Sequence, residues 1–233
     1  KIVGVININN KRTKEPFSND DLQLLKALAS QGAVAIERAR LYQNLQDVYM
    51  QTIKALAVAI DAKDHYTHNH SESVTKYAVE IAVEMGFSRE KIETLSQACQ
   101  LHDLGKIGIH DYILSKSDKL SDDEWQKIKS HSLKSAEILE PLVFLNGVIE
   151  MVKQHHERYD GAGYPYGVKG DNIRLGARIM AVADAYDAMT SDRPYKKAML
   201  QKDAMAELKK CSGKQFDPKV VSAFLRVLER RNK

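Results

Sequence analysis

Five of the eight histidines and two of the aspartates occur in apolar stretches, where polar side chains need an explanation. His102 and Asp103 end the apolar run in ACQLHDLGKIGI, and Asp184 interrupts ARIMAVADAYDAM. Helical spacing turns the histidines toward the same faces as nearby Ile, Val and Met residues. The full set is His70, His102, Asp103, His131, His155, His156 and Asp184.

Any one of these residues, taken alone, is more simply explained as a core side chain that forms hydrogen bonds than as a metal ligand. Seven such residues in one domain favour a metal site instead. A buried carboxylate needs a partner, and both imidazole and carboxylate are natural ligands of Mn, Fe and Zn. Seven ligands are too many for one tetrahedral ion. They suit two ions about 3.5–4 Å apart with one bridging carboxylate, the arrangement of metal-assisted phosphoester hydrolysis.

The stretch HHERYDGAGYP adds a flexible loop directly after two adjacent histidines. Gly161 and Gly163 tolerate unusual backbone angles and allow a backbone to approach a bulky substrate closely. Tyr164 and Pro165 are expected to stiffen the loop. We therefore expect this loop to lie beside the metal site.

The composition is that of an ordinary globular protein, with 43% hydrophobic and 28% charged residues among 233. A net charge of +4, with cations and anions interspersed, suits an anionic small molecule and argues against nucleic-acid binding. No apolar run reaches the roughly 18 residues of a membrane span. Cys99 and Cys211 are far apart, which favours reduced thiols and a cytoplasmic location.

The chain around these residues has a mainly helical pattern. KIVGVINI predicts a buried strand, and Ser18 with Asp21 predicts a capped helix start. No proline interrupts the chain from there to about Ala62, so a helix of about 40 residues and roughly 60 Å is expected. We interpret it as a signalling helix paired in a dimer, with two helices and an undetected break as the alternative.

From Gln51 onward the sequence predicts an all-α domain of helices with short loops. Ser121 and Glu124 form a second capping box ahead of WQKIKSHSLKSAEIL, which should stop at Pro141. Trp125 is interpreted as a core residue.

The pair His102-Asp103 in LHDLGKIGI resembles the signature of the HD phosphohydrolase superfamily, and HHERYDGAGYP is similar to that of its HD-GYP branch of bacterial cyclic di-GMP phosphodiesterases. The resemblance runs from about Ala55 to Leu228. It implies an HD-domain helical bundle and a metal-ligand set that falls on the seven residues above. One ion would take His70, His102 and Asp184, the other His131, His155 and His156, with Asp103 as the bridge.

The same resemblance gives roles to three cations and to the metals. Lys106 matches a lysine near the scissile phosphate, and Arg193 and Lys196 match positions that hold substrate phosphates. Without the resemblance, Lys196 would be interpreted as a solvated surface charge. Two divalent ions are implied, Fe or Mn in preference to Zn or Ni. The implied reaction is hydrolysis of cyclic di-GMP to pGpG, with a further cut to GMP left open.

Several positions depart from the family pattern. Ser73 stands where many members have Arg, and Ser132 where Pro is usual. Tyr66 occupies the place of a Glu that binds a third metal in some relatives, so two ions are expected here. His65, His68 and His110 are interpreted as exposed, with His68 as a substitute ligand if His70 points elsewhere. Asp187 is a candidate for orienting a ligand or pairing with Arg193.

The N-terminal stretch IVGVININNKRTKEPFSNDDLQLLKALASQGAVAIERARLY resembles the C-terminal end of a GAF sensor domain, and this implies that the front of such a domain lies outside the sequence. The expected organisation is a GAF remnant over residues 1–42, a linker helix over 43–62 and the phosphodiesterase domain over 63–233. The expected partners are cyclic di-GMP, a second copy of the chain through the long helix, and proteins of a bacterial signalling system.

Two rival functions remain at this point. One is hydrolysis of another cyclic dinucleotide such as cyclic GMP-AMP, because the sequence does not show which base is recognised. The other is a metal-stabilised module that binds a nucleotide or a partner without turnover. The intact ligand set together with Lys106 argues against the second.

Overall fold

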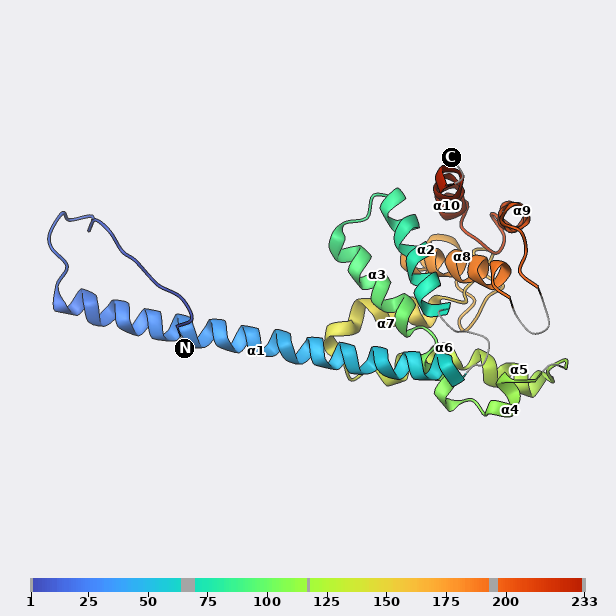
Figure 1. The fold of residues 1–233 in the computed structure, drawn as a ribbon, viewed down its shortest axis with the longest axis horizontal. Coiled ribbons are helices and arrows are strands. Elements are labelled where there is room, and N and C mark those ends of the chain that lie inside the picture. Colours follow the sequence, from blue (N-terminus) through green and yellow to red (C-terminus); the bar gives the residue numbers. More distant parts are fainter. Residues whose placement is uncertain (1, 64–69, 117, 193–196, 232–233) are drawn as a thin grey trace. The chain divides into compact units, whose positions relative to one another are not determined.

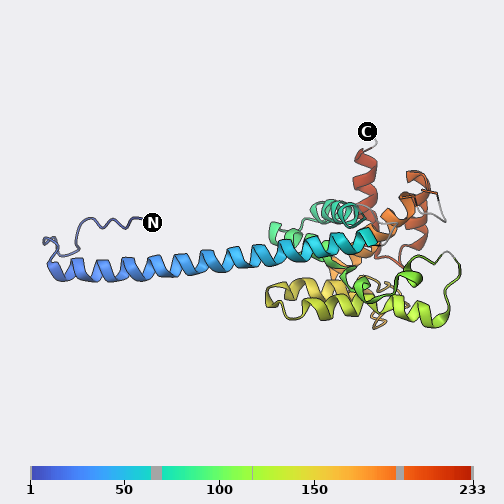
Figure 2. The same ribbon diagram turned by 60° about the horizontal axis from the view of Figure 1, so that its bottom comes forward.

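The computed structural model describes residues 2–63, 70–116, 118–192 and 197–231. The chain forms two compact units, Lys1–Thr52 and Ile53–Lys233. Their helices are labelled in Figure 1 and seen from a second direction in Figure 2. Over the described residues the only β pairing is an isolated bridge between Ser212 and Phe216, which confirms the all-α prediction.

The first unit contains an irregular N-terminal segment and most of the long helix α1 (Asn19–Lys63). The predicted strand is wrong, because residues 2–8 pair with no other described segment and a strand needs a partner. The helix start is confirmed: the Asp21 amide donates to Ser18 Oγ at 3.2 Å, and the Ser18 amide donates to Asp21 Oδ2 at 2.7 Å. The helix is continuous over 45 residues, so the predicted alternative of a break is wrong.

The second unit is a helical bundle. Its longer helices are α2 (His70–Glu84), α3 (Arg89–Leu101), α6 (His131–Leu139), α7 (Asn146–Gln154), α8 (Leu175–Thr190), α9 (Gln201–Cys211) and α10 (Pro218–Arg231). Shorter elements are η1 (Leu104–Gly108), α4 (Asp111–Leu114), α5 (Asp122–Lys129), η2 (Val143–Leu145) and η3 (Gly170–Asn172). None of the helices in the described ranges is long and apolar enough to cross a bilayer.

The core of the bundle lies where α2 packs on α3, α8 and α10, and where α3 packs on α7 (Figure 1). Val74, Ile81 and Leu95 are fully buried there, as are Val152, Ile179 and Phe224. Tyr186 on α8 makes edge-on ring contacts with Tyr77 at 5.0 Å and Phe224 at 4.9 Å, which ties three helices together. This apolar packing fixes the helix ends that carry the candidate metal ligands.

The segment after Ser121 differs from the prediction in two ways. The capping box of Ser121 and Glu124 is present, but the helix breaks at Ser130 into α5 and α6. The expectation that Trp125 belongs to the core is wrong, since its surface is 43% exposed. The physical reason is that α5 lies on the surface and buries none of its eight residues.

Candidate metal centre

The seven predicted ligands come from five regions of the bundle, and six of them lie at helix ends. His70 and His131 are the first residues of α2 and α6. The pair His102-Asp103 directly follows α3, the pair His155-His156 directly follows α7, and Asp184 lies inside α8. Helix ends are suited to this task because they allow adjacent residues to point in directions that a continuing helix would separate.

The structure brings the ligand atoms together in three overlapping groups, one of which, His102, Asp103 and His155, shares a residue with each of the other two. The atoms of His70, His102 and Asp184 lie within 4.8 Å of one another, as do those of His131, His155 and His156. His70 Nε2 is 3.2 Å from Asp184 Oδ1, and His131 Nε2 is 3.3 Å from His155 Nε2 and 3.2 Å from His156 Nε2. These are the two sets that the family resemblance implied, so the geometry is compatible with the predicted division.

Asp103 lies between the two groups. Its Oδ2 is 3.4 Å from His102 Nε2 in one group, and its Oδ1 is 3.3 Å from His131 Nε2 in the other. The Lys106 ammonium is 2.8 Å from Oδ2. A carboxylate with one oxygen turned toward each group has the placement that a bridging ligand requires.

The protonation of the histidine rings follows from their outer contacts. The Nδ1 atoms of His102, His131 and His155 lie 2.6–2.7 Å from the carbonyl oxygens of Cys99, Ile128 and Val152, each three residues earlier. A carbonyl can only accept a hydrogen bond, so Nδ1 carries the proton in each ring. The Nε2 lone pairs therefore face the centre, as in metal-binding histidines.

His70 is oriented differently, by a carboxylate. Its Nδ1 lies 2.6 Å from Oδ2 of the buried Asp187, which is the positioning role predicted for Asp187. Burial would lower the pKa of His70, but the hydrogen bonds to Asp184 and Asp187 outweigh it and raise that pKa to about 10. The predicted pairing of Asp187 with Arg193 lies outside the described residues.

The two groups differ in charge. Burial tends to raise the pKa of Asp103, but His102 and Lys106 outweigh burial and hold the pKa well below its usual value. Burial and the neighbouring His156 lower the pKa of His155 well below its usual value, and burial lowers the pKa of His156 to about 3. Burial also lowers the pKa of His131, so one group consists of three neutral imidazoles. The other group pairs the carboxylate of Asp184 with His70, whose pKa is raised.

This donor set fits divalent metal ions. The Nε2 lone pairs of His131 and His155 face each other at 3.3 Å, and they repel unless a cation lies between them. Nitrogen with carboxylate oxygen suits Fe, Mn and Zn, and the ligand types alone do not choose among them.

The loop of the HHERYDGAGYP stretch is held close to the histidines. The Tyr164 ring lies 4.8 Å from the His156 ring, and burial raises the pKa of Tyr164. Gly161 has φ of 85°, and a Cβ on Gly163 would lie 2.2 Å from the Arg158 amide nitrogen. Both glycines are thus needed for the path of the loop, and this sharpens their predicted role as residues that let the backbone pack closely.

The remaining predicted residues are placed as follows. Lys106 lies beside Asp103, whereas Arg193, Lys196, His65, Tyr66 and His68 lie outside the described residues. His110 is exposed and stacks on Tyr112 at 5.8 Å, in agreement with its interpretation as a surface residue.

Two residues that hold η1 against α6, Ser135 and Gly105, were not predicted from the sequence. Ser135 on α6 is fully buried, accepts a hydrogen bond from the Gly105 amide and donates one to the His102 carbonyl, both at 2.7 Å. A Cβ on Gly105 would lie 2.1 Å from the His131 carbonyl oxygen. The spacing of Ser135, four residues after His131 and on the same helical face, was the available signal.

We expect Ser135→Ala to weaken the centre without removing a ligand. It leaves a buried amide and a buried carbonyl unpaired, which costs about 1–3 kcal/mol of unfolding free energy. Loss of support for His102 should lower metal affinity about 10–100-fold. Denaturant unfolding and metal titration measure both effects. Ser132→Ala is the matched control, since Ser132 is equally buried on α6 but its hydroxyl donates to the Lys129 carbonyl, three residues earlier in the chain, at 3.3 Å. Equal effects of the two variants would contradict the bridging role.

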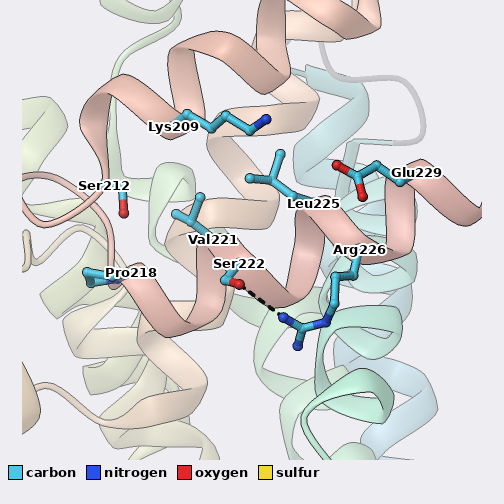
Figure 3. Close-up of a pocket in the computed structure, with 8 residues that line it drawn as sticks. All are labelled: Lys209, Ser212, Pro218, Val221, Ser222, Leu225, Arg226 and Glu229. Atoms are coloured by element: carbon cyan, nitrogen blue, oxygen red, sulfur yellow. Dashed lines mark hydrogen bonds between the residues drawn. The ribbon is translucent and has the colours of Figure 1, made fainter.

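A separate hollow of about 310 Å³ lies between α9 and α10 (Figure 3). Val221 and Leu225 line it together with Lys209 and Arg226, and Arg226 Nη1 donates to Ser222 Oγ at 3.0 Å. Arg226 also pairs with Glu84 on α2 at 2.7 Å. None of the lining residues belongs to the predicted metal centre, so the hollow is not the candidate active site.

Known proteins resemble this chain in sequence and fold. A family model described as an HD domain matches residues 54–220. A protein of Xanthomonas campestris named cyclic di-GMP phosphodiesterase response regulator RpfG is 39% identical over 84% of this chain and 53% of its own length. A cyclic di-GMP phosphodiesterase of Thermotoga maritima is 38% identical over 80% of this chain and 51% of its own.

A third relative carries a different substrate in its name. The 3'3'-cGAMP-specific phosphodiesterase 3 of Vibrio cholerae is 36% identical over 85% of this chain and 44% of its own. A solved structure of a cyclic GMP-AMP specific phosphodiesterase from V. cholerae matches the fold with a TM-score of 0.61 at 19% identity, over 77% of this chain and 48% of that one.

The chain spans about half the length of the curated relatives it matches. The family model nevertheless covers well over half of the chain and includes every candidate ligand. The chain belongs to the HD-domain family.

Proposed function

We propose that this chain holds the catalytic domain of an HD-GYP phosphodiesterase that hydrolyses cyclic di-GMP to linear pGpG, with GMP as a further product. The observation that carries the proposal is Asp103, which places one carboxylate oxygen toward each of two three-residue groups. Relatives named cyclic di-GMP phosphodiesterases at 38–39% identity support the substrate.

The proposed ligands are His70, His102 and Asp184 for one ion, His131, His155 and His156 for the other, and Asp103 for both. Two divalent ions, Fe or Mn, would polarise the phosphate and lower the pKa of water. The reaction adds water to one phosphodiester: a bond forms from the water oxygen to phosphorus, the bond to the 3′ oxygen breaks, and that oxygen gains a proton. Lys106 would place a positive charge beside the developing charge on phosphate.

Arg193 and Lys196 are proposed to hold the substrate's phosphates, on the strength of the family resemblance alone. Gly161, Gly163 and Tyr164 are proposed to contact the substrate or shape its entrance. The contact between the Tyr164 and His156 rings supports this placement of the loop.

Hydrolysis of cyclic GMP-AMP is the second candidate function, because relatives with that specificity in their names are 36% identical to this chain. The decisive test incubates metal-loaded protein with cyclic di-GMP, 3'3'-cyclic GMP-AMP and cyclic di-AMP, and separates the products. We expect the fastest turnover with cyclic di-GMP. A higher kcat/KM for the hybrid would establish the second candidate, and tight binding without any cleavage would establish a binding module.

We also propose that the N-terminal segment is the end of a GAF sensor domain and that α1 transmits its state. Ile2 and Val5 are nearly fully exposed, and apolar side chains of this size in such a patch are usually covered by another surface. At the other end of the long helix, Asp61 accepts a 2.5 Å hydrogen bond from the Ser71 hydroxyl. Ser71 is adjacent to the candidate ligand His70, so this contact is a route from the helix to the centre.

We propose that two copies of the chain associate through α1 in a coiled coil. Large apolar side chains are exposed along it at Leu22, Leu24, Leu28, Val34, Ile36, Leu41, Tyr42, Leu45, Val48 and Tyr49. A single soluble helix rarely exposes so many, and a second copy would cover them.

The free thiols of Cys99 and Cys211 support the predicted bacterial cytoplasm.

The dimer is tested by charges placed in this surface. Leu41→Glu with Leu45→Glu should raise the dimer dissociation constant at least tenfold in sedimentation, because the carboxylates would be buried at the contact. Asn44→Glu, a charge on the same turn at a polar position, is the control. An unchanged monomer–dimer equilibrium in the double variant would rule out pairing through α1.

A further inference from the structure

Three side chains continue from the three-histidine group toward the surface. The Tyr164 ring lies 4.8 Å from the His156 ring. The Lys129 ammonium lies 5.5 Å from the centre of the Tyr164 ring and 5.7 Å from that of Trp125. Exposure grows along this row, from the buried His131 and His155 to Trp125 at 43%. We call Trp125, Lys129 and Tyr164 the aromatic–lysine row.

The backbone holds this row in register with the centre. Trp125 and Lys129 are four residues apart on α5, so they lie on one face of that helix. Lys129 is the last residue of α5, and after the break at Ser130 the candidate ligand His131 begins α6. The Tyr164 amide donates to the His156 carbonyl at 3.3 Å, which fixes the other end of the row.

Lys129 is a partly buried cation whose neighbours are two aromatic faces. No carboxylate in the described parts of the chain pairs with it, whereas Lys106 and Lys116 each have a carboxylate partner. An ammonium between rings keeps donors available for an incoming acceptor, because a ring face interacts with its charge and offers no strong lone pair.

We propose that Trp125 and Lys129 form a guanine-binding subsite, an inference that rests on the proposed function. A purine ring stacks on an exposed indole, an interaction open to any base. The choice of base comes from Lys129: guanine presents two neighbouring acceptors, N7 and O6, whereas adenine presents the N7 acceptor beside an amino donor. An ammonium accordingly favours guanine and meets a repelling donor on adenine.

The subsite makes Lys129 a specificity-determining residue that leaves the chemistry to the metal centre. Lys129→Met keeps an unbranched side chain that is one atom shorter, and it removes the donors. We expect it to raise KM for cyclic di-GMP about tenfold, in line with the loss of a paired base contact, with kcat and metal content unchanged. The dissociation constant of cyclic di-AMP, measured by competition, should change less than twofold.

Two further variants separate this role from general damage. Lys127→Met removes an exposed lysine from the same helix and should leave all constants unchanged. Trp125→Leu should weaken cyclic di-GMP and cyclic di-AMP alike, and Trp125→Phe should restore most of the loss, because stacking needs a ring of either kind.

The base-selective change is the signature of the proposal. An equal loss of all cyclic dinucleotides in Lys129→Met would mean contact with a phosphate and would overturn it, as would no change at all. If the wild-type protein binds cyclic di-GMP without cleaving it, the proposed function fails, and the subsite is still decided by the same variants through equilibrium binding. If the wild-type protein binds no cyclic dinucleotide, both proposals fail.

Discussion

Asp103→Asn should lower kcat about 10³-fold while the fold is retained. Asparagine preserves the shape of the side chain but removes the negative charge and one acceptor oxygen from the point where the two groups meet, 3.3 Å from His131 and 3.4 Å from His102. A charge facing two divalent ions contributes several kcal/mol, and about 4 kcal/mol corresponds to this loss of rate. Steady-state kinetics with cyclic di-GMP and far-ultraviolet circular dichroism measure the two parts of the prediction.

Asp187→Asn is the matched control for that variant. Asp187 is as buried as Asp103 and also contacts a candidate ligand, but it touches His70 on the Nδ1 side, away from the other group. Its loss should weaken metal binding about 10–100-fold and be compensated by added metal. An Asp103→Asn enzyme within tenfold of wild-type activity would show that Asp103 is not the bridging ligand.

Gly105→Ala should lower the free energy of unfolding of the bundle by about 3 kcal/mol and displace the metal ligands from one another. A Cβ there would lie 2.1 Å from the His131 carbonyl oxygen and 2.5 Å from the Ser135 amide nitrogen, and neither backbone atom can move without shifting α6. Because η1 approaches α6 this closely, Asp103 on one side reaches His131 on the other. Denaturant unfolding gives the loss of stability, and elemental analysis gives the loss of metal.

Gly108→Ala tests whether glycine loss in this segment is harmful in general. Gly108 is in the same η1 element, but a Cβ there would meet only the Lys134 side chain, 3.1 Å from its Nζ. That flexible side chain can move, so we expect a change within about 0.5 kcal/mol. Equal destabilisation by both variants would mean that the contact between η1 and α6 is not what requires Gly105.

The helical class of the bundle and the inward position of the histidines were predictable from the sequence. The apolar periodicity was strong, and both capping boxes used side chains whose hydrogen bonds are local. The apolar periodicity correctly predicted that histidines are buried, but it placed them on the inner faces of helices. His70, His102, His131 and His155 are buried at helix ends instead, where packing of neighbouring helices turns them inward.

Other features depend on contacts between distant residues and were not predictable in this way. The break at Ser130 has no sequence signal, because serine is compatible with both a helix interior and a helix boundary. Trp125 looked like a core residue, yet it lies on a short surface helix. The hydrogen bonds of Ser135 join residues about thirty positions apart, and only the packing of η1 on α6 creates them.

The assignment of individual ligands came from the family resemblance, since spacing alone gave seven polar residues and no division between them. The structure adds the two groups of three and the position of Asp103 between them. The phosphate-binding roles of Arg193 and Lys196 stay predictions of the resemblance.

The central claim is that two ions occupy the two groups and that hydrolysis depends on them. Its most direct test is elemental analysis of protein purified without oxygen, followed by incubation with cyclic di-GMP, beside a His102→Ala/Asp103→Ala variant. We expect two equivalents of Fe or Mn per chain and formation of pGpG by the wild-type protein, with reduced metal and no product from the variant. Fewer than two metals per chain in an active wild-type protein, or equal turnover by both proteins, would contradict it.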